Sequence, residues 1–163
     1  MNEKKPLRKS EKKEAKKGNK AKHDAYREAF ARIEAANESQ FFLEAVAIQE
    51  AIISDRLKSH LGHLGKLPKR KRPTLSDLVD AWKSENQSQR LEIKINLAEL
   101  VDQWRVLRNQ AVHGLVATHS VIDFLESAEV AAKTGEILAR AVCDWHKGEV
   151  RKAKLNNKSK KIS

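Results

Sequence analysis

Residues 96–114, NLAELVDQWRVLRNQAVHG, have the pattern of an amphipathic helix. Asn96, with Glu99 three residues later, forms a capping box, which is typical of a helix start. Apolar side chains then recur at intervals of three and four, which places them on one face of a helix. They are Leu97, Leu100, Val101, Trp104, Leu107 and Ala111. Gly114 suits a left-handed C-cap, so we expect the helix to end there.

Helical spacing recurs on both sides of this segment. It predicts helices over residues 26–36, from about 41 to 64, from Thr74, which forms an approximate capping box with Asp77, and from Ser120 to about Trp145. The second of these is apolar on several faces, so we expect it at the centre of the core. Residues 91–95 alternate like a strand, but the capping box follows directly, and we interpret them as an extended lead-in. The predicted fold is all-α, a compact bundle of four to five helices joined by short loops.

The formal charge of +11 is concentrated at the two ends of the chain. Residues 1–22 contain ten Lys or Arg against three Glu, and residues 147–163 contain seven against one, so the remainder carries −2. We therefore predict a disordered basic tail over residues 1–22, one helical domain over 23–150 and a second basic tail over 151–163. Such tails can hold phosphate groups without reading sequence, or they can serve solubility alone, and both interpretations stay open.

The apolar runs of the chain are far shorter than the roughly 18 residues that cross a bilayer, and no apolar core follows the lysine-rich start. We expect a protein that neither spans a membrane nor carries a signal peptide. Cys143 is the single cysteine, so no disulfide can form within the chain, as suits a reducing compartment. The expected location is the cytoplasm.

Three side chains near the end of the 96–114 helix carry the chemistry. Arg108 lies four residues after Trp104 and continues the apolar stripe, where a guanidinium that cannot lose its charge requires an anionic partner. Asn109 and His113 are four apart and share another side of the helix. Together they supply a permanent cation, an amide and a titratable imidazole. These are the groups that phosphate binding, orientation and proton transfer require.

The order Arg108-Asn109-x-x-x-His113, with Leu107 before it and Gly114 after it, resembles the motif of nucleases in the HEPN superfamily. A looser spacing of Arg and His occurs three times in the chain, so the adjacent Asn109 and the following Gly114 distinguish this copy. The resemblance is sharp over residues 107–114. Over about residues 24–150 it is only architectural, as a helical bundle.

This resemblance implies a homodimeric, metal-independent endoribonuclease of the toxin or phage-defence kind, which needs no cofactor. An antitoxin or another protein partner would restrain its activity. Two copies of His113 would move protons to and from the RNA, and two of Arg108 would stabilise charge on the phosphate. Asn109 would orient the phosphate or the imidazole. The acidic residue that the family often carries on an earlier helix corresponds to Glu50 or Asp55, and the sequence does not choose between them.

A second interpretation makes the chain a non-catalytic helical module that binds RNA, a nucleotide or a protein partner. A histidine followed by glycine is also an ordinary helix end, favoured by the helix dipole. Arg108 would then be a structural partner for Glu44, Glu50 or Asp55.

The loop between Pro68 and Pro73 is basic and open to several interpretations. It consists of Lys69, Arg70, Lys71 and Arg72, which could contact RNA, form an address read by a nuclear importer, or act as a solvated linker. Two pairs three residues apart, His60 with His63 and Cys143 with His146, each offer a metal only two ligands, so we expect no metal site. Trp82, Trp104 and Trp145 fall on apolar stripes and are predicted in the core or a dimer interface.

Overall fold

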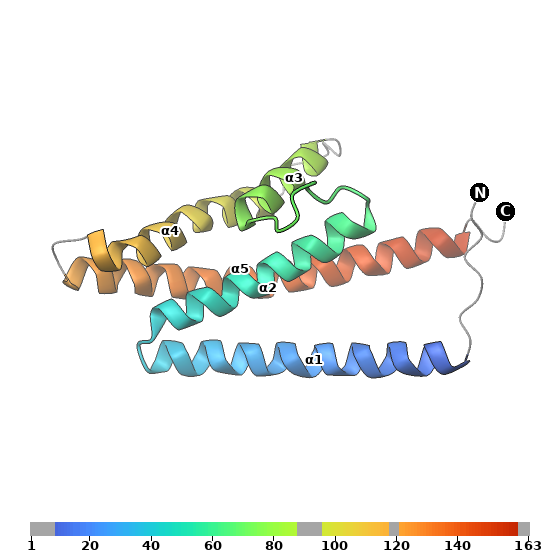
Figure 1. The fold of residues 1–163 in the computed structure, drawn as a ribbon, viewed down its shortest axis with the longest axis horizontal. Helices are drawn as coiled ribbons and strands as arrows, with labels where there is room; N and C mark the ends of the chain where they lie inside the picture. The colour runs from blue at the N-terminus through green and yellow to red at the C-terminus, as the bar shows by residue number, and fades with distance from the viewer. Residues whose placement is uncertain (1–8, 88–95, 118–120, 160–163) are drawn as a thin grey trace.

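The computed structural model describes residues 9–87, 96–117 and 121–159, and all regular structure within them is helical. The five helices are α1 (Lys9–Glu38), α2 (Phe42–His63), α3 (Leu75–Gln87), α4 (Leu97–Ala117) and α5 (Val121–Ser159) (Figure 1). The prediction of an all-α bundle of four to five helices is confirmed. None of the described helices is both long and apolar enough to span a bilayer.

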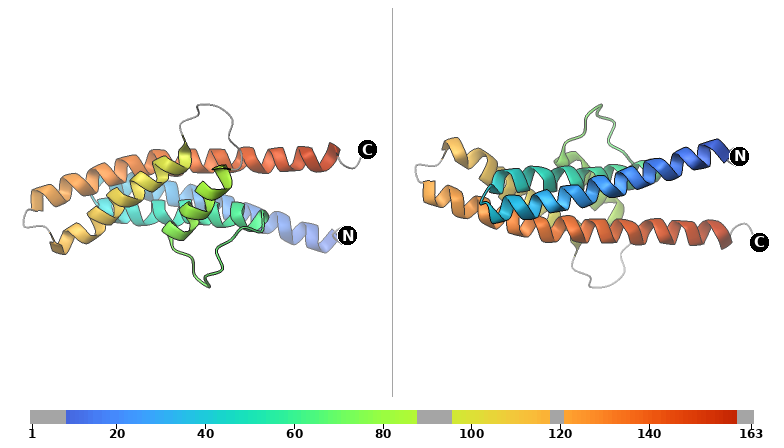
Figure 2. Two further views of the ribbon diagram at one scale, coloured as in Figure 1. Left: turned by 90° about the horizontal axis from the view of Figure 1, so that it is seen from above. Right: turned by 90° about the horizontal axis from the view of Figure 1, so that it is seen from below.

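Helix α2 lies at the centre of the bundle, as its apolar breadth predicted. It contacts each of the other four helices: in Figure 1, α1 lies below it and α3 and α4 lie above it, while α5 runs behind it (Figures 1 and 2). Nine of its side chains are buried: Phe42, Ala45, Val46, Gln49, Ile52, Ile53, Leu57, His60 and Leu61. Burial on several faces explains why this helix does not show a single apolar stripe.

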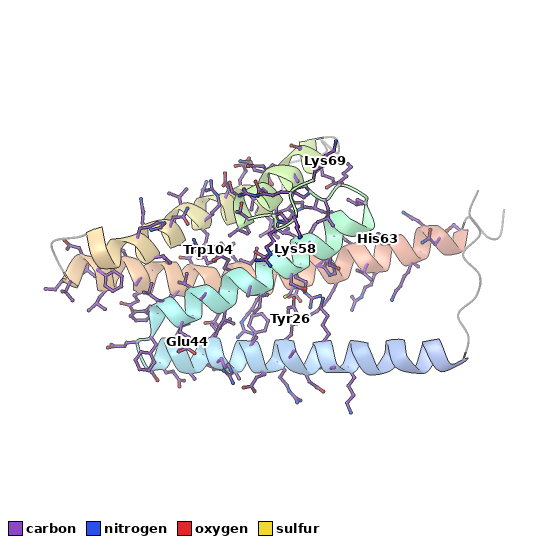
Figure 3. The ribbon with its side chains drawn as sticks, viewed as in Figure 1. Tyr26, Glu44, Lys58, His63, Lys69 and Trp104 are labelled. Atoms are coloured by element: carbon purple, nitrogen blue, oxygen red, sulfur yellow. The ribbon has the colours of Figure 1, made fainter. Side chains whose placement is uncertain are left out.

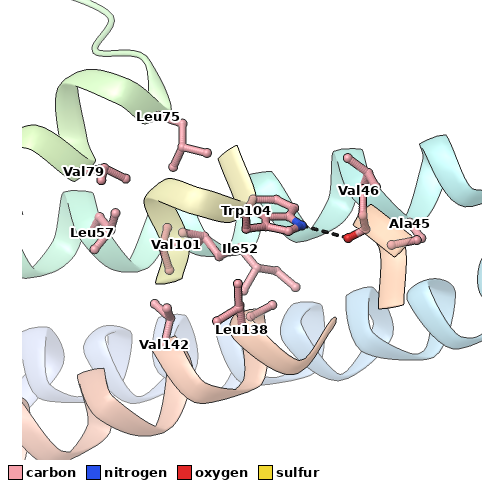
Figure 4. Packing of buried hydrophobic residues seen from close by; sticks show 14 of the residues in the cluster. Ala45, Val46, Ile52, Leu57, Leu75, Val79, Val101, Trp104, Leu138 and Val142 are labelled. Carbon is pink, nitrogen blue, oxygen red and sulfur yellow. Dashed lines mark hydrogen bonds between the residues drawn. The ribbon is translucent and has the colours of Figure 1, made fainter. Parts of the chain in front are cut away.

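The buried core includes the region where α2, α4 and α5 meet, around the indole of Trp104 (Figure 4). Trp104 Nε1 donates a hydrogen bond of 2.8 Å to the carbonyl oxygen of Ala131 on α5. Gln49 Nε2, from α2, donates one of the same length to the next carbonyl, that of Ala132. Gly135 makes this approach possible, because a Cβ there would overlap Gln49 Oε1 and lie 2.6 Å from Trp104 Nε1. These two hydrogen bonds join α2 and α4 to adjacent carbonyls of α5.

The predicted helix starts at Thr74 and Asn96 are confirmed. The Thr74 backbone N–H donates to Asp77 Oδ2 at 2.8 Å, and the Asp77 N–H donates to Thr74 Oγ1 at 3.2 Å, a reciprocal capping box. Asn96 Oδ1 accepts a hydrogen bond of 3.2 Å from the Ala98 N–H. Glu99 instead pairs with Lys83 at 3.0 Å, which ties α4 to α3.

Parts of the two basic ends are helical where the structure describes them. Helix α1 begins at Lys9, well before the predicted start near residue 26, and α5 continues to Ser159. Lys, Glu and Ala have high helix propensity, so these segments can extend a packed helix without burying an apolar face. Residues 1–8, 160–163 and the predicted lead-in at 91–95 lie outside the described residues.

Candidate functional site

The hydrogen-bonded Trp104 fixes α4, and Arg108 follows one helical turn later. The Arg108 guanidinium reaches α2, where its Nη2 forms an ion pair with Glu50. Its Nη1 donates a hydrogen bond of 2.8 Å to Oδ1 of the adjacent Asn109. The Arg108 and Glu50 side chains are 26% and 25% exposed, so solvent or a ligand can still reach the pair.

The anionic partner that Arg108 requires is therefore Glu50. Asp55, the other acidic candidate, faces α1 instead, where it pairs with Lys22 Nζ at 2.9 Å and accepts a hydrogen bond of 2.5 Å from Tyr26 Oη. Burial of the Asp55 carboxyl opposes its ionisation, but the hydrogen bonds from Lys22 and Tyr26 outweigh this and lower its pKa. Asp55 belongs to a different part of the molecule from Arg108.

His113 lies further along α4 and is exposed to solvent, as is the neighbouring Val112. The expectation that Gly114 ends the helix is wrong, because α4 continues to Ala117. Gly114 is buried, so it faces packed neighbours rather than a turn. The helix continues past Gly114 despite the cost of about 1 kcal/mol for a glycine inside a helix. His113 therefore sits within a helix rather than at its end.

The basic loop does not join this cluster. Lys69, Arg70, Lys71 and Arg72 are all exposed, and Arg70 lies 3.5 Å from Asp77 of α3. In Figure 3, Lys69 lies beside α3 and the end of α2, whereas the last turns of α4 extend in the opposite direction beyond Trp104. The structure thus brings together Arg108, Asn109 and Glu50, with His113 further along the same helix.

One chain can perform only part of an acid–base reaction with these groups. The guanidinium and the amide can bind and orient an anion, and Glu50 holds the guanidinium in place. The exposed imidazole of His113 can accept or donate a proton. A reaction that needs both operations in one turnover would require a second group for proton transfer.

A second cluster, between the C-terminal parts of α2 and α5, was not predicted from the sequence. The His60 and Trp145 rings lie 4.6 Å apart, and His60 Nε2 lies 3.8 Å from a Glu85 carboxylate oxygen. His60 and His146 line a hollow of about 510 Å³. Burial lowers the pKa of His146, and the charges of Arg56 and His60 lower it further.

The sequence pairs each of these histidines only with a neighbour on its own helix, and their approach depends on how α2 packs against α5. Across the described ranges, no three His, Cys, Asp or Glu side chains are grouped as a metal would require. The contacts of this cluster are aromatic and electrostatic.

Comparisons with known protein families, curated proteins and solved structures find no match to this chain.

Proposed function

We propose that this protein is a metal-independent endoribonuclease of the HEPN kind, acting on cytoplasmic RNA as a toxin or a phage-defence enzyme. The observation that carries the proposal is the partly exposed Arg108 guanidinium, oriented by Glu50 and Asn109, on the same helix as the exposed His113. A fixed guanidinium lowers the reorganisation needed to stabilise charge on a phosphate. The second N–H of each terminal nitrogen can donate to phosphate oxygens while Glu50 stays bound, whereas Nε is buried without a hydrogen-bond partner.

The chemistry would use the 2′-hydroxyl of the RNA as the nucleophile. His113 of one copy removes the 2′-hydroxyl proton, and the 2′-oxygen forms a bond to phosphorus. The bond between phosphorus and the 5′-oxygen breaks, and His113 of a second copy protonates that oxygen. The products are a 2′,3′-cyclic phosphate and a 5′-hydroxyl, with no redox change. The two copies exchange protons with water to return to their starting states.

The second copy would come from a homodimer, and the end of the molecule that carries His113 offers a surface for it. Val112 of α4 is partly exposed, and Val121, Ile122 and Leu125 at the start of α5 are exposed by 74%, 68% and 45%. Exposed apolar side chains that gather in one region are typical of protein interfaces. A two-fold axis through this region would bring two His113 side chains toward one cleft.

The test is an RNA cleavage assay in EDTA with purified protein. We expect His113→Ala and Arg108→Ala to lose at least about a hundredfold in rate while remaining folded and dimeric. His63→Ala is the control, because His63 is another exposed histidine, at the end of α2, and this variant should cleave like the wild type. Equal cleavage by all three variants would refute the assignment.

One observation favours a second candidate, a non-catalytic module that binds RNA, a nucleotide or a protein partner. Arg108 already has its carboxylate, Glu50, within the chain, as a purely structural ion pair would. This candidate predicts that the wild type leaves RNA intact and that Glu50→Gln lowers stability. Cleavage by the wild type that disappears in His113→Ala, with the melting temperature unchanged, excludes it.

A further inference from the structure

The half-buried cation that lacks a carboxylate is Arg56, on the opposite side of α2 from the Arg108 site. Its Nε is buried without a hydrogen-bond partner, and within the described ranges no carboxylate oxygen lies at ion-pair distance from it. Its guanidinium carbon stacks 3.8 Å from the centre of the Tyr26 ring. A guanidinium cannot be neutralised by losing a proton, so this position favours an external anion.

Arg56 borders a hollow of about 440 Å³ between α1, α2 and α5. Its lining consists of cations, aromatic rings and one thiol: Lys22, His23, Tyr26, Arg27, Phe30, Arg56, Cys143 and Lys147. Tyr26 projects from α1 toward the other two helices (Figure 3). A hollow of this size is in the range that binds small ligands.

The two lining groups that could become anions stay neutral. Burial raises the pKa of the Tyr26 phenol, and its hydrogen bond to Asp55 raises it further. Burial also raises the pKa of the Cys143 thiol. The ionised side chains of the lining are therefore cations only.

Carboxylates outside the lining offset part of this charge. Asp55 pairs with Lys22 at 2.9 Å, and Asp144 pairs with Lys147 at the same distance. Both pairs are well exposed, and such pairs contribute little and exchange partners readily. Lysines of this kind can turn to a bound phosphate, whereas the side-chain hydrogen bond of Arg56 within the hollow is to the neutral Cys143 thiol rather than to a carboxylate.

We propose that this hollow is a nucleotide site, in which Arg56 and the flanking lysines hold the 5′-phosphate and the aromatic rings contact the base. Guanidinium and ammonium groups recognise phosphate by charge-assisted hydrogen bonds. Arg56 stacks over the Tyr26 ring and Arg140 over the Phe30 ring, so the base would contact the remaining surface of these two rings. The site is distinct from Arg108 and His113 and does not depend on RNA cleavage.

Calorimetric titration at low salt in EDTA tests the proposal with AMP, adenosine and inorganic phosphate. We expect AMP to bind at least about tenfold more tightly than either of the other two, because each lacks one half of the recognised ligand. If adenosine bound as tightly as AMP, the proposed contact between Arg56 and the phosphate would be wrong. Equal affinity for inorganic phosphate would overturn the nucleotide assignment.

Variants locate the binding. Arg56→Gln should weaken AMP binding at least about tenfold, whereas Arg32→Gln, which removes the same charge from an exposed position on α1, should leave it unchanged. Lys147→Gln should weaken it several-fold, and because that side chain is exposed the variant tests the site without disturbing the core. His113→Asn should bind AMP like the wild type. Equal binding by Arg56→Gln and Arg32→Gln would overturn the proposal.

A short 2′-O-methyl RNA, which cannot be cleaved through its 2′-oxygen, identifies the source of the nucleotide. If the 5′-phosphorylated strand competes with AMP but the same strand with a 5′-hydroxyl does not, the nucleotide bound in the site is the 5′ end of an RNA. Competition by neither indicates a free nucleotide. Competition by both equally would contradict recognition of a 5′-phosphate.

Discussion

Replacing Gly135 with alanine should destabilise the fold and disturb the Arg108 cluster together. The new Cβ would overlap Gln49 Oε1 and lie 2.6 Å from Trp104 Nε1. Both side chains are fully buried and hydrogen-bonded to the carbonyls of α5, so neither can move away without leaving a polar group unpaired. Trp104 lies one turn before Arg108, and Gln49 directly precedes Glu50.

The magnitude follows from three effects. Forcing a methyl group into a packed core costs about 1–3 kcal/mol. Losing either buried hydrogen bond costs a further 1–3 kcal/mol or so. Replacing a glycine within a helix by alanine stabilises the helix by about 1 kcal/mol, which opposes these losses. The net loss is about 3 kcal/mol, which lowers the melting temperature by roughly 6–12 °C for a domain of this size.

Urea unfolding followed by circular dichroism measures this loss. Gly148→Ala is the matched control, because Gly148 lies on the same helix with nothing within 4 Å of its would-be Cβ. We expect the control to match or exceed the wild type by up to about 1 kcal/mol. If Gly135→Ala were as stable as Gly148→Ala, the argument that a close three-helix contact requires glycine would be wrong.

Three further outcomes are expected. Thr74→Ala should lose about 1 kcal/mol in urea unfolding, because the capping box with Asp77 disappears, and an unchanged midpoint would contradict it. The lowered pKa of His146 means that the folded state resists protonation of this side chain. The free energy of unfolding should therefore fall as the pH drops below the pKa of histidine in the unfolded chain, about 6.5. The melting temperature of His146→Asn should depend less on pH below this value than that of the wild type. Ile122→Glu should shift the dimer toward monomer, as measured by light scattering. Leu155→Glu should not, although Leu155 is similarly exposed at the far end of α5. Dissociation by both variants would refute an interface near Ile122.

Local patterns allowed much of the fold to be predicted. The caps at Thr74 and Asn96 depend on residues two or three positions away, so the sequence contains all the information needed. The early start of α1 was not predicted, because apolar spacing was the signal and its first turns lack an apolar face. Their helix-forming composition was the available clue.

The Arg108 site shows where sequence reasoning stops. Position on the apolar stripe correctly implied an anionic partner for Arg108. The choice between Glu50 and Asp55 depends on which side of α2 faces α4, and those two residues are about 140° apart around the helix. The interior position of Gly114 in α4 is hidden from the sequence for a similar reason, since its burial reflects packing with other elements rather than the adjacent residues.

Helix α5 carries both the carbonyl that holds Trp104 and, 16 residues later, the Lys147 side chain beside Arg56. The two positions are about 24 Å apart along one helix axis. Inserting or deleting a single residue between them would rotate one relative to the other by about 100°. This part of the chain should therefore tolerate substitutions on its solvent face but not insertions or deletions. Insertions and deletions should be tolerated only in the connections between helices.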